Sequence, residues 1–142
     1  MQKIRDDIIY QSIPQRPPFL FVDRVLSIDE NKIVTALNLT GEEDFFKGHF
    51  PGNPVFPGVL MQETLFQTAA ILASQMALAE TAKLGVVSRV QNAKFKNMVK
   101  PPAALVCEVT KGEALANAYF MTGKLTLEGK IVLVMEFSVA LV

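Results

Sequence analysis

The spacing of hydrophobic residues predicts two helices in the first half of the chain. Ile4 and Ile8 lie four residues apart, which indicates a short amphipathic helix over residues 3–12 that ends before Pro14. After Gly58 the chain has no proline or glycine until about Ala82, and alanine, leucine, methionine and glutamine prevail. This second helix is apolar on most sides, which is typical of a helix enclosed by other structure.

Strand patterns fill most of the remaining chain. Branched and aromatic residues are dense before the polar turn at residues 29–32, and apolar residues return after it, which predicts a hairpin. Glu128-Gly129-Lys130 predicts a second tight turn. The predicted strands are residues 19–28, 33–39, 86–99, 105–110, 115–127 and 131–142. We therefore expect one domain over residues 1–142, with an α+β fold in which a mostly antiparallel sheet of about six strands wraps a long central helix.

The last predicted strand is apolar on both faces. Ile131, Leu133 and Met135 alternate with Val132 and Val134. One face can cover the helix. We expect the other to meet a second subunit or another layer, because such a surface is rarely left in water.

Composition and charge exclude several classes of function. Half of the residues are hydrophobic, which argues against disorder, and 14 basic residues balance 14 acidic ones. The formal net charge is zero, so the overall charge gives no indication that the protein binds nucleic acid or an anionic membrane. Cys107 is the only cysteine and His49 the only histidine, so no disulfide forms within the chain and a transition-metal site has few ligands.

The hydrophobic segments do not indicate export or membrane insertion. The N-terminus is interrupted by charges and lacks the apolar core of a signal peptide. The longest apolar stretch, residues 59–79, contains several polar side chains, and this makes it a poor membrane span. We expect a cytoplasmic location.

The candidate chemistry centres on His49. It lies in residues 47–58, which read Lys-Gly-His-Phe-Pro-Gly-Asn-Pro-Val-Phe-Pro-Gly. Three prolines restrict the backbone that presents the imidazole, which favours a preorganised side chain. An unperturbed imidazole has a pKa of about 6.5, so His49 is suited to act as a general base. A histidine that only caps the loop is the structural alternative.

The start of the long helix supplies three further candidates. Glu63 follows five residues after Gly58, and burial there would raise the pKa of its carboxyl group and suit it to act as an acid. A solvated glutamate in an early helical turn is the alternative. Gly58 is placed as the first helical residue, where its N–H can stabilise a developing oxyanion or where glycine simply serves the turn. Gln67 could bond the Glu63 carboxyl group or the backbone. Glu63, Gln67 and Ser74 fall within about 40° around the helix.

Three segments together are similar to one known family. They are Ile13-Pro-Gln-Arg-Pro-Pro-Phe-Leu-Phe-Val-Asp-Arg-Val25, Phe46-Lys-Gly-His-Phe-Pro-Gly-Asn-Pro-Val-Phe-Pro-Gly-Val-Leu-Met-Gln-Glu63 and Ala93-Lys-Phe-Lys96. The chain resembles, over nearly its whole length, the β-hydroxyacyl-[acyl carrier protein] dehydratases, which have the hot-dog fold. The resemblance implies that His49 and Glu63 form the catalytic pair, each from a different subunit. Glutamate at the second position is similar to the dehydratase-only branch of that family.

The resemblance also implies a reaction and its partners. We expect dehydration of (3R)-3-hydroxyacyl-[acyl carrier protein] to the trans-2-enoyl product, with His49 as base, Glu63 as acid partner and Gly58 as oxyanion donor. No cofactor is implied beyond the phosphopantetheine arm that carries the substrate. The implied partners are acyl carrier protein and a second copy of the chain, in a dimer that could assemble further into a trimer of dimers.

Two departures from the family pattern, and several other residues, leave alternatives open. Gln15 replaces the usual histidine of Pro-His-Arg, and residues 100–104 replace a Pro-Gly-Asp step. An acyl thioesterase and a non-catalytic carrier-binding subunit are the alternative functions. Asp23 and Arg24 could form a structural ion pair, within the chain or between subunits. A loose basic group could dock the acidic carrier or be a solvated strand face; its members are Arg89, Lys94, Lys96 and Lys100.

Overall fold

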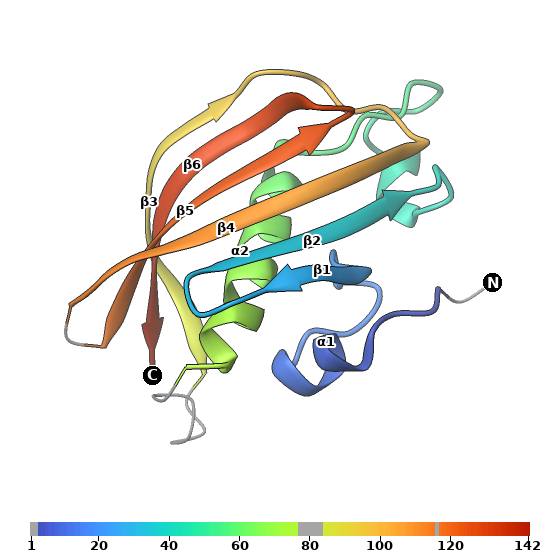
Figure 1. Cartoon of the computed structure of the whole chain (residues 1–142). Coiled ribbons are helices and arrows are strands. Elements are labelled where there is room, and N and C mark those ends of the chain that lie inside the picture. Colours follow the sequence, from blue (N-terminus) through green and yellow to red (C-terminus); the bar gives the residue numbers. More distant parts are fainter. Residues whose placement is uncertain (1–2, 77–83, 116) are drawn as a thin grey trace.

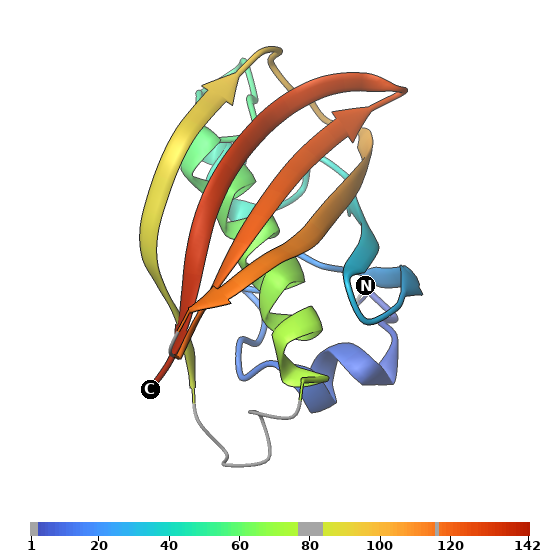
Figure 2. The same cartoon turned by 60° about the vertical axis from the view of Figure 1, so that its left-hand side comes forward.

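One curved sheet wraps a single long helix in the computed structural model, which describes residues 3–76, 84–115 and 117–142. Helix α2 lies along the concave face of the sheet, and α1 lies beside the C-terminal end of α2 (Figures 1 and 2). The elements are α1 Asp7–Ser12, β1 Arg24–Ile28, β2 Lys32–Leu39, the 3₁₀ helix η1 Asp44–Lys47, α2 Gly58–Ser74, β3 Gly85–Phe95, β4 Ala103–Leu115, β5 Ala118–Leu127 and β6 Lys130–Leu141.

The sheet is antiparallel between all neighbouring strands. Its order is β1-β2-β4-β5-β6-β3, so β1 and β3 form its edges. Glu128 and Gly129 both have positive φ, at 52° and 81°, and form the tight turn between β5 and β6. Both central positions of a type I′ hairpin turn require positive φ. The predicted α+β fold, with a sheet wrapped around a long helix, is confirmed.

The core fills the space between α2 and the sheet. Phe66 of α2 meets Phe137 of β6 edge-to-face, with ring centroids 5.3 Å apart. At Gly123 of β5 a Cβ would lie 3.2 Å from the side chain of Leu65, so glycine allows the strand to approach the helix closely. In the last strand Leu133, Met135 and Phe137 are buried as the alternation predicts, whereas Ile131 is exposed.

Both helices differ in length from the sequence prediction. The first begins at Asp7 rather than residue 3; Lys3 and Arg5 lie outside the helix and pair with Asp23. Ile4, expected on the buried face of that helix, is 96% exposed. The second begins at Gly58 as predicted but ends at Ser74, and the predicted extension over residues 77–82 lies outside the described residues.

The predicted first strand is half as long as expected. Residues 19–23 are not part of β1, and several backbone groups of residues 19–22 bond to side chains instead. The Phe21 N–H donates to Gln67 Oε1 at 2.7 Å, and Arg5 Nε donates to the Val22 carbonyl at 3.1 Å. This segment therefore lies against α2. By contrast, β4 is longer than predicted, because it extends to Leu115 and the predicted strand covered only residues 105–110.

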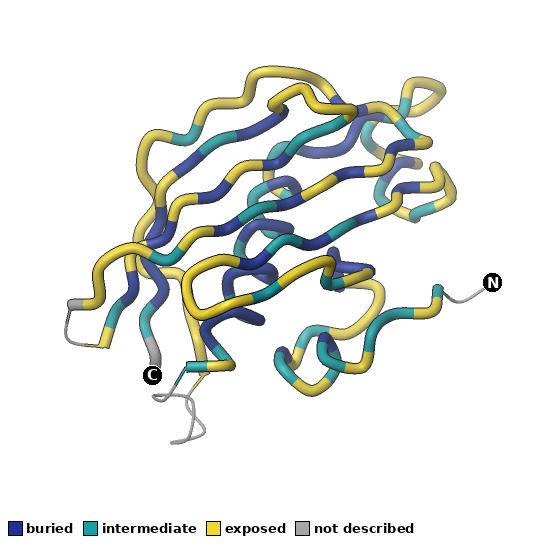
Figure 3. Tube along the Cα trace, viewed as in Figure 1, coloured by how far each residue is buried: buried dark blue, intermediate teal, exposed yellow. Residues whose placement is uncertain are grey.

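Strand β3 is an exposed edge. All its residues except Ala93 are exposed, whereas β2 and β5 alternate between buried and more exposed positions (Figure 3). Val86, Val87 and Val90 are among the exposed apolar side chains. A long apolar edge with unpaired backbone groups is a typical pairing surface for another chain.

Within one chain, Asp23 does not form the predicted ion pair with Arg24. Asp23 is buried, with Lys3 Nζ at 2.9 Å from one carboxylate oxygen and Arg5 Nε at 3.1 Å from the other. The Asn38 N–H also donates to Asp23, at 2.8 Å. Arg24 is exposed. The buried carboxylate thus fixes the N-terminal arm to β2.

No helix in the described residues is long and apolar enough to cross a membrane.

We expect Asp23→Ala to lower the free energy of unfolding by about 3 kcal/mol, because it leaves two cations and a buried N–H without their partner. Urea unfolding at fixed protein concentration measures the change. Arg24→Ala is the matched control and should change stability by less than about 0.5 kcal/mol. Equal losses in the two variants would contradict the assignment of the ion pairs.

Candidate active site

A network of hydrogen bonds holds His49 in its loop. The His49 ring nitrogen Nδ1 lies 2.7 Å from the Val55 carbonyl oxygen, and the Val55 N–H donates to the His49 carbonyl at 2.8 Å. Phe50 and Asn53 exchange backbone hydrogen bonds at 3.0 and 2.8 Å. The Phe50 ring stacks on the imidazole with centroids 4.0 Å apart. The imidazole is therefore fixed in position and orientation.

The hydrogen bond to Val55 also fixes the tautomer of the neutral imidazole. A carbonyl oxygen only accepts, so His49 Nδ1 carries the proton and donates. In the neutral ring the other nitrogen, Nε2, then carries the free lone pair. His49 therefore presents a base at Nε2.

The N-terminus of α2 has free donors. Pro57 is the N-cap and supplies no side-chain hydrogen bond, while its carbonyl accepts from the N–H groups of Leu60 and Met61. Among the described residues no acceptor bonds the Gly58 or Val59 N–H. Gly58 is the first helical residue, as predicted. A Cβ there would lie 3.0 Å from the ring of Phe95, so glycine leaves room for that ring. These free N–H groups can bind an anion.

His49 and Gly58 line one pocket. Its volume is about 330 Å³. Met61 of α2, Phe95 of β3 and Lys96 line it as well. The structure thus brings the predicted base and the predicted oxyanion donor together, under the ring of Phe95.

Glu63 lies on a different side of α2. Residues 61 and 63 are about 200° apart around a helix, so Glu63 faces away from the side of Met61, which lines the His49 pocket. Of the described residues that line the His49 pocket, none is Glu63. Within one chain, the predicted catalytic pair therefore does not share a pocket.

Gln67 holds the Glu63 carboxyl group. Gln67 Nε2 donates to Glu63 Oε2 at 3.0 Å and to the Phe19 carbonyl at 3.2 Å, while its Oε1 accepts from the Phe21 N–H. Gln67 is fully buried. Both predicted alternatives for this residue are thus realised at once. One amide joins α2, the preceding segment and the candidate acid.

Burial raises the pKa of Glu63 above its ordinary value of 4.5, and the hydrogen bond from Gln67 offsets part of that rise. The raised pKa predicted from the helix is confirmed. Desolvation favours the protonated carboxyl group. Glu63 is thereby better suited to donate a proton near neutral pH than an exposed glutamate is.

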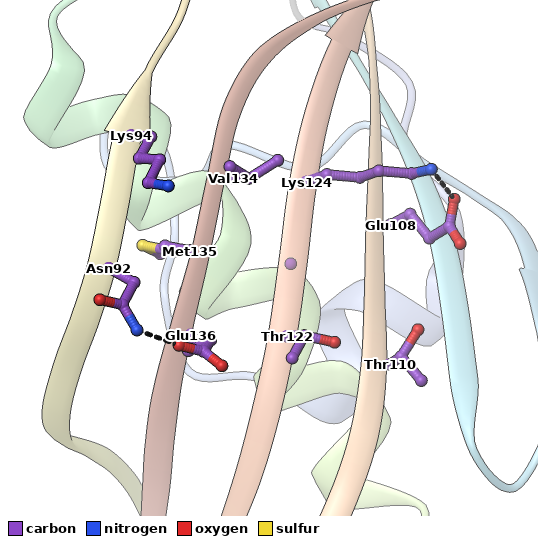
Figure 4. A pocket seen from close by; sticks show the side chains of 10 residues that line it. Asn92, Lys94, Glu108, Thr110, Thr122, Lys124, Val134, Met135 and Glu136 are labelled. Carbon is purple, nitrogen blue, oxygen red and sulfur yellow. Dashed lines mark hydrogen bonds and ion pairs between the residues drawn. The ribbon is translucent and has the colours of Figure 1, made fainter.

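The predicted basic group does not gather at one pocket. Lys96 lines the His49 pocket. Lys94 lies instead on the outer face, opposite α2, near Val134 and Glu136 (Figure 4). Glu136 there accepts a hydrogen bond from Asn92, and Glu108 is paired with Lys124. Only Lys96 of the four predicted residues lines the pocket that contains the candidate base.

Two parts of the site were not predicted from the sequence. The Val55 carbonyl sets the tautomer of His49, and a backbone group leaves no mark in the residue pattern. Phe95 covers Gly58, although its place in a strand gave no sign of that contact. No group of three or more potential metal ligands occurs among residues 3–76, 84–115 and 117–142.

The stability of Glu63→Gln relative to the native protein should increase between pH 4 and pH 7. A carboxyl group whose pKa is raised contributes stability below its unfolded pKa, and that contribution is lost as the pH rises through the folded pKa. Urea unfolding across this range measures the difference. Glu108→Gln should show the opposite trend, because the hydrogen bond from Lys32 lowers the pKa of Glu108. Parallel trends would contradict the burial of Glu63.

Comparison with known proteins identifies the family of the chain. A FabA-like domain is matched over residues 13–136. The chain is 41% identical over 127 residues to the 3-hydroxyacyl-[acyl-carrier-protein] dehydratase FabZ of Rickettsia massiliae, covering 89% of this chain and 88% of that protein. It is 39% identical over 131 residues to the protein of the same name from Rickettsia felis, covering 92% of this chain and 90% of that protein.

Solved structures share the fold. The dehydratase heterocomplex ApeI:P from Xenorhabdus doucetiae matches with a TM-score of 0.79 at 9% identity, over 94% of this chain and 90% of that one. A hypothetical thioesterase with coenzyme A from Streptococcus pneumoniae matches with a TM-score of 0.64 at 10% identity, over 83% of this chain and 84% of that one. The hot-dog fold implied by the resemblance is confirmed. The chain belongs to the FabA-like family.

Proposed function

We propose that this protein is a 3-hydroxyacyl-[acyl carrier protein] dehydratase, a hydro-lyase of fatty-acid or related lipid synthesis. The observation that supports it best is the shared pocket of His49 and Gly58. There an imidazole whose Nδ1 is already bonded offers Nε2 as a base, next to a helix N-terminus with free N–H groups. The relatives named for this reaction are about 40% identical over most of the chain.

The proposed reaction is an elimination. His49 Nε2 takes the proton from C2 of the substrate, and the electron pair of that C–H bond delocalises onto the thioester oxygen. The Gly58 N–H stabilises the resulting negative charge, a contribution typically worth ~10²–10³ in rate. The pair then forms the C2–C3 double bond as the C3–O bond breaks. Glu63 donates its proton to the leaving hydroxide, and water is released.

The complete site requires two copies of the chain. Glu63 is separated from His49 within one chain, but it lies on a face of α2 that the sheet leaves uncovered. The half-buried or exposed residues of this open face include Val59, Gln62, Glu63, Ala70 and Ser74. The exposed edge of β3 is a second surface suited to pairing. A twofold dimer over these surfaces would bring the partner's histidine loop to Glu63.

Lys96 is the candidate contact for the carrier. It is the one predicted basic residue that lines the His49 pocket, and a cation there can attract an acidic carrier or the phosphate of its prosthetic arm. A base, an acid and an N–H donor suffice for the elimination, so we propose that no further cofactor takes part. We also propose a cytoplasmic location for this reaction.

His49→Ala should abolish dehydration and leave a folded protein of unchanged oligomeric state. Mass spectrometry of 3-hydroxyacyl-carriers of graded chain length, incubated with each protein, measures the loss of water. Turnover near the native rate in the variant would refute His49 as the base. Release of free thiol without dehydration would support a thioesterase instead.

A mixture of inactive subunits should recover activity. In a dimer formed from one His49→Ala and one Glu63→Gln chain, one of the two shared sites has both native residues. Random re-association of equal amounts then restores about a quarter of the native activity. Denaturing and refolding the two variants together, and separately as controls, measures this. Absence of recovery, with mixed dimers demonstrated by differential tags, would contradict the shared site.

A further inference from the structure

The ring of Phe95 lies against the first residue of α2. At Gly58 an added Cβ would lie 3.0, 3.4 and 3.6 Å from Phe95 Cε1, Cδ1 and Cζ, which are neighbouring atoms of one ring edge. Phe95 is the last residue of β3, and Figure 2 shows this end of the strand beside the start of α2. Phe95 and Gly58 also line the His49 pocket together. The ring therefore presents one edge to the candidate oxyanion donor.

The backbone on the C-terminal side of Phe95 is anchored at two points. The Lys96 N–H donates to the Val132 carbonyl of β6 at 2.8 Å. Three residues later, the Val99 carbonyl accepts from the Phe56 N–H of the histidine loop, also at 2.8 Å. These bonds hold the segment that carries the ring against both β6 and the loop that presents His49. The contact between the ring and Gly58 is therefore set by the fold.

The Gly58 N–H and the Phe95 ring border the same space. The N–H groups of a first helical turn point out of the N-terminal end of the helix, and the Cα–Cβ bond of a helical residue is tilted toward that end as well. A ring in contact with the Cβ position of Gly58 therefore borders the space that an acceptor of its N–H would occupy. The edge of an aromatic ring carries a positive partial charge, so it does not repel an anionic oxygen there.

We propose that Phe95 is a positioning residue for the oxyanion: its ring keeps water from one side of the Gly58 N–H and so strengthens the hydrogen bond from this N–H to the thioester oxygen. The inference rests on the proposed function, because it requires a thioester substrate beside His49. A hydrogen bond is electrostatically stronger where water is excluded. Phe95 is 51% exposed, so its ring forms a wall of the pocket rather than part of the buried core.

Phe95→Ala should lower kcat about tenfold and change KM by less than about twofold, because charge on the thioester oxygen develops only in the transition state. Phe95→Leu keeps an apolar side chain beside Gly58 and should recover most of the lost rate. Phe120→Ala removes a ring of similar exposure, 40%, from β5 and should keep native kinetic constants. Because Phe95 lies on the β3 edge, size-exclusion chromatography checks the oligomeric state, and Phe95→Val replaces Phe95→Ala if that state changes.

Two spectroscopic measurements separate this role from simple packing. Butanoyl-pantetheine with a ¹³C-labelled carbonyl has no hydroxyl to lose, and the infrared stretch of its bound carbonyl reports the hydrogen bond to the thioester oxygen. We expect the shift to lower wavenumber on binding to fall by about half or more in Phe95→Ala, but not in Phe120→Ala. In the protein without ligand, amide hydrogen exchange at Gly58, relative to the neighbouring N–H of Val59, should become severalfold faster in Phe95→Ala.

The same carbonyl shift in the native protein and Phe95→Ala would overturn the proposal, whatever the effect of the substitution on the rate. Absence of dehydration by the native protein would instead refute the proposed function. In that case the exchange measurement still decides whether the ring screens the Gly58 N–H from water, since it needs no substrate. An exchange ratio that does not change in Phe95→Ala would then overturn the inference as well.

Discussion

The chemistry of the site depends on one hydrogen bond, from His49 Nδ1 to the Val55 carbonyl at 2.7 Å. It determines which ring nitrogen is free, and it directs that nitrogen away from the loop that holds the ring. The prolines, the reciprocal bond from Val55 to His49 and the stacked Phe50 all support this one geometry. An imidazole held in this way loses little entropy on reaching its reactive orientation, which is the benefit of a preorganised base.

The second constraint is that α2 supports two functions on different faces. Its N-terminus offers free N–H groups toward His49, while Glu63 and Gln67 face the segment that precedes β1. A helix cannot turn both faces toward one pocket, so the proposed pair requires two copies of the chain. The open face of α2 and the exposed β3 edge are consistent with that requirement. In the proposed reaction, burial of Glu63 favours the protonated acid at a cost in stability at neutral pH.

Much of the fold follows from residue patterns, and the differences have physical causes. The start of α2 at Gly58 and the turn at Gly129 were predicted because proline and glycine act locally. Residues 19–23 were wrongly predicted as strand, because the distant Gln67 and Arg5 bond their backbone. The Asp23 partners, likewise, lie on an arm that the pattern had assigned to a helix. Local patterns predicted the candidate residues at the site, whereas the tautomer of His49 depends on a backbone carbonyl.

The most direct test of the account is the tautomer of His49. Since the chain has one histidine, ¹⁵N-histidine labelling gives signals from this ring alone. At a pH where the ring is neutral, the account predicts a protonated Nδ1 and an unprotonated Nε2 in the long-range ¹H–¹⁵N spectrum. A spectrum with the proton on Nε2 would contradict it, because the nitrogen that faces the substrate would then have no lone pair to accept the C2 proton.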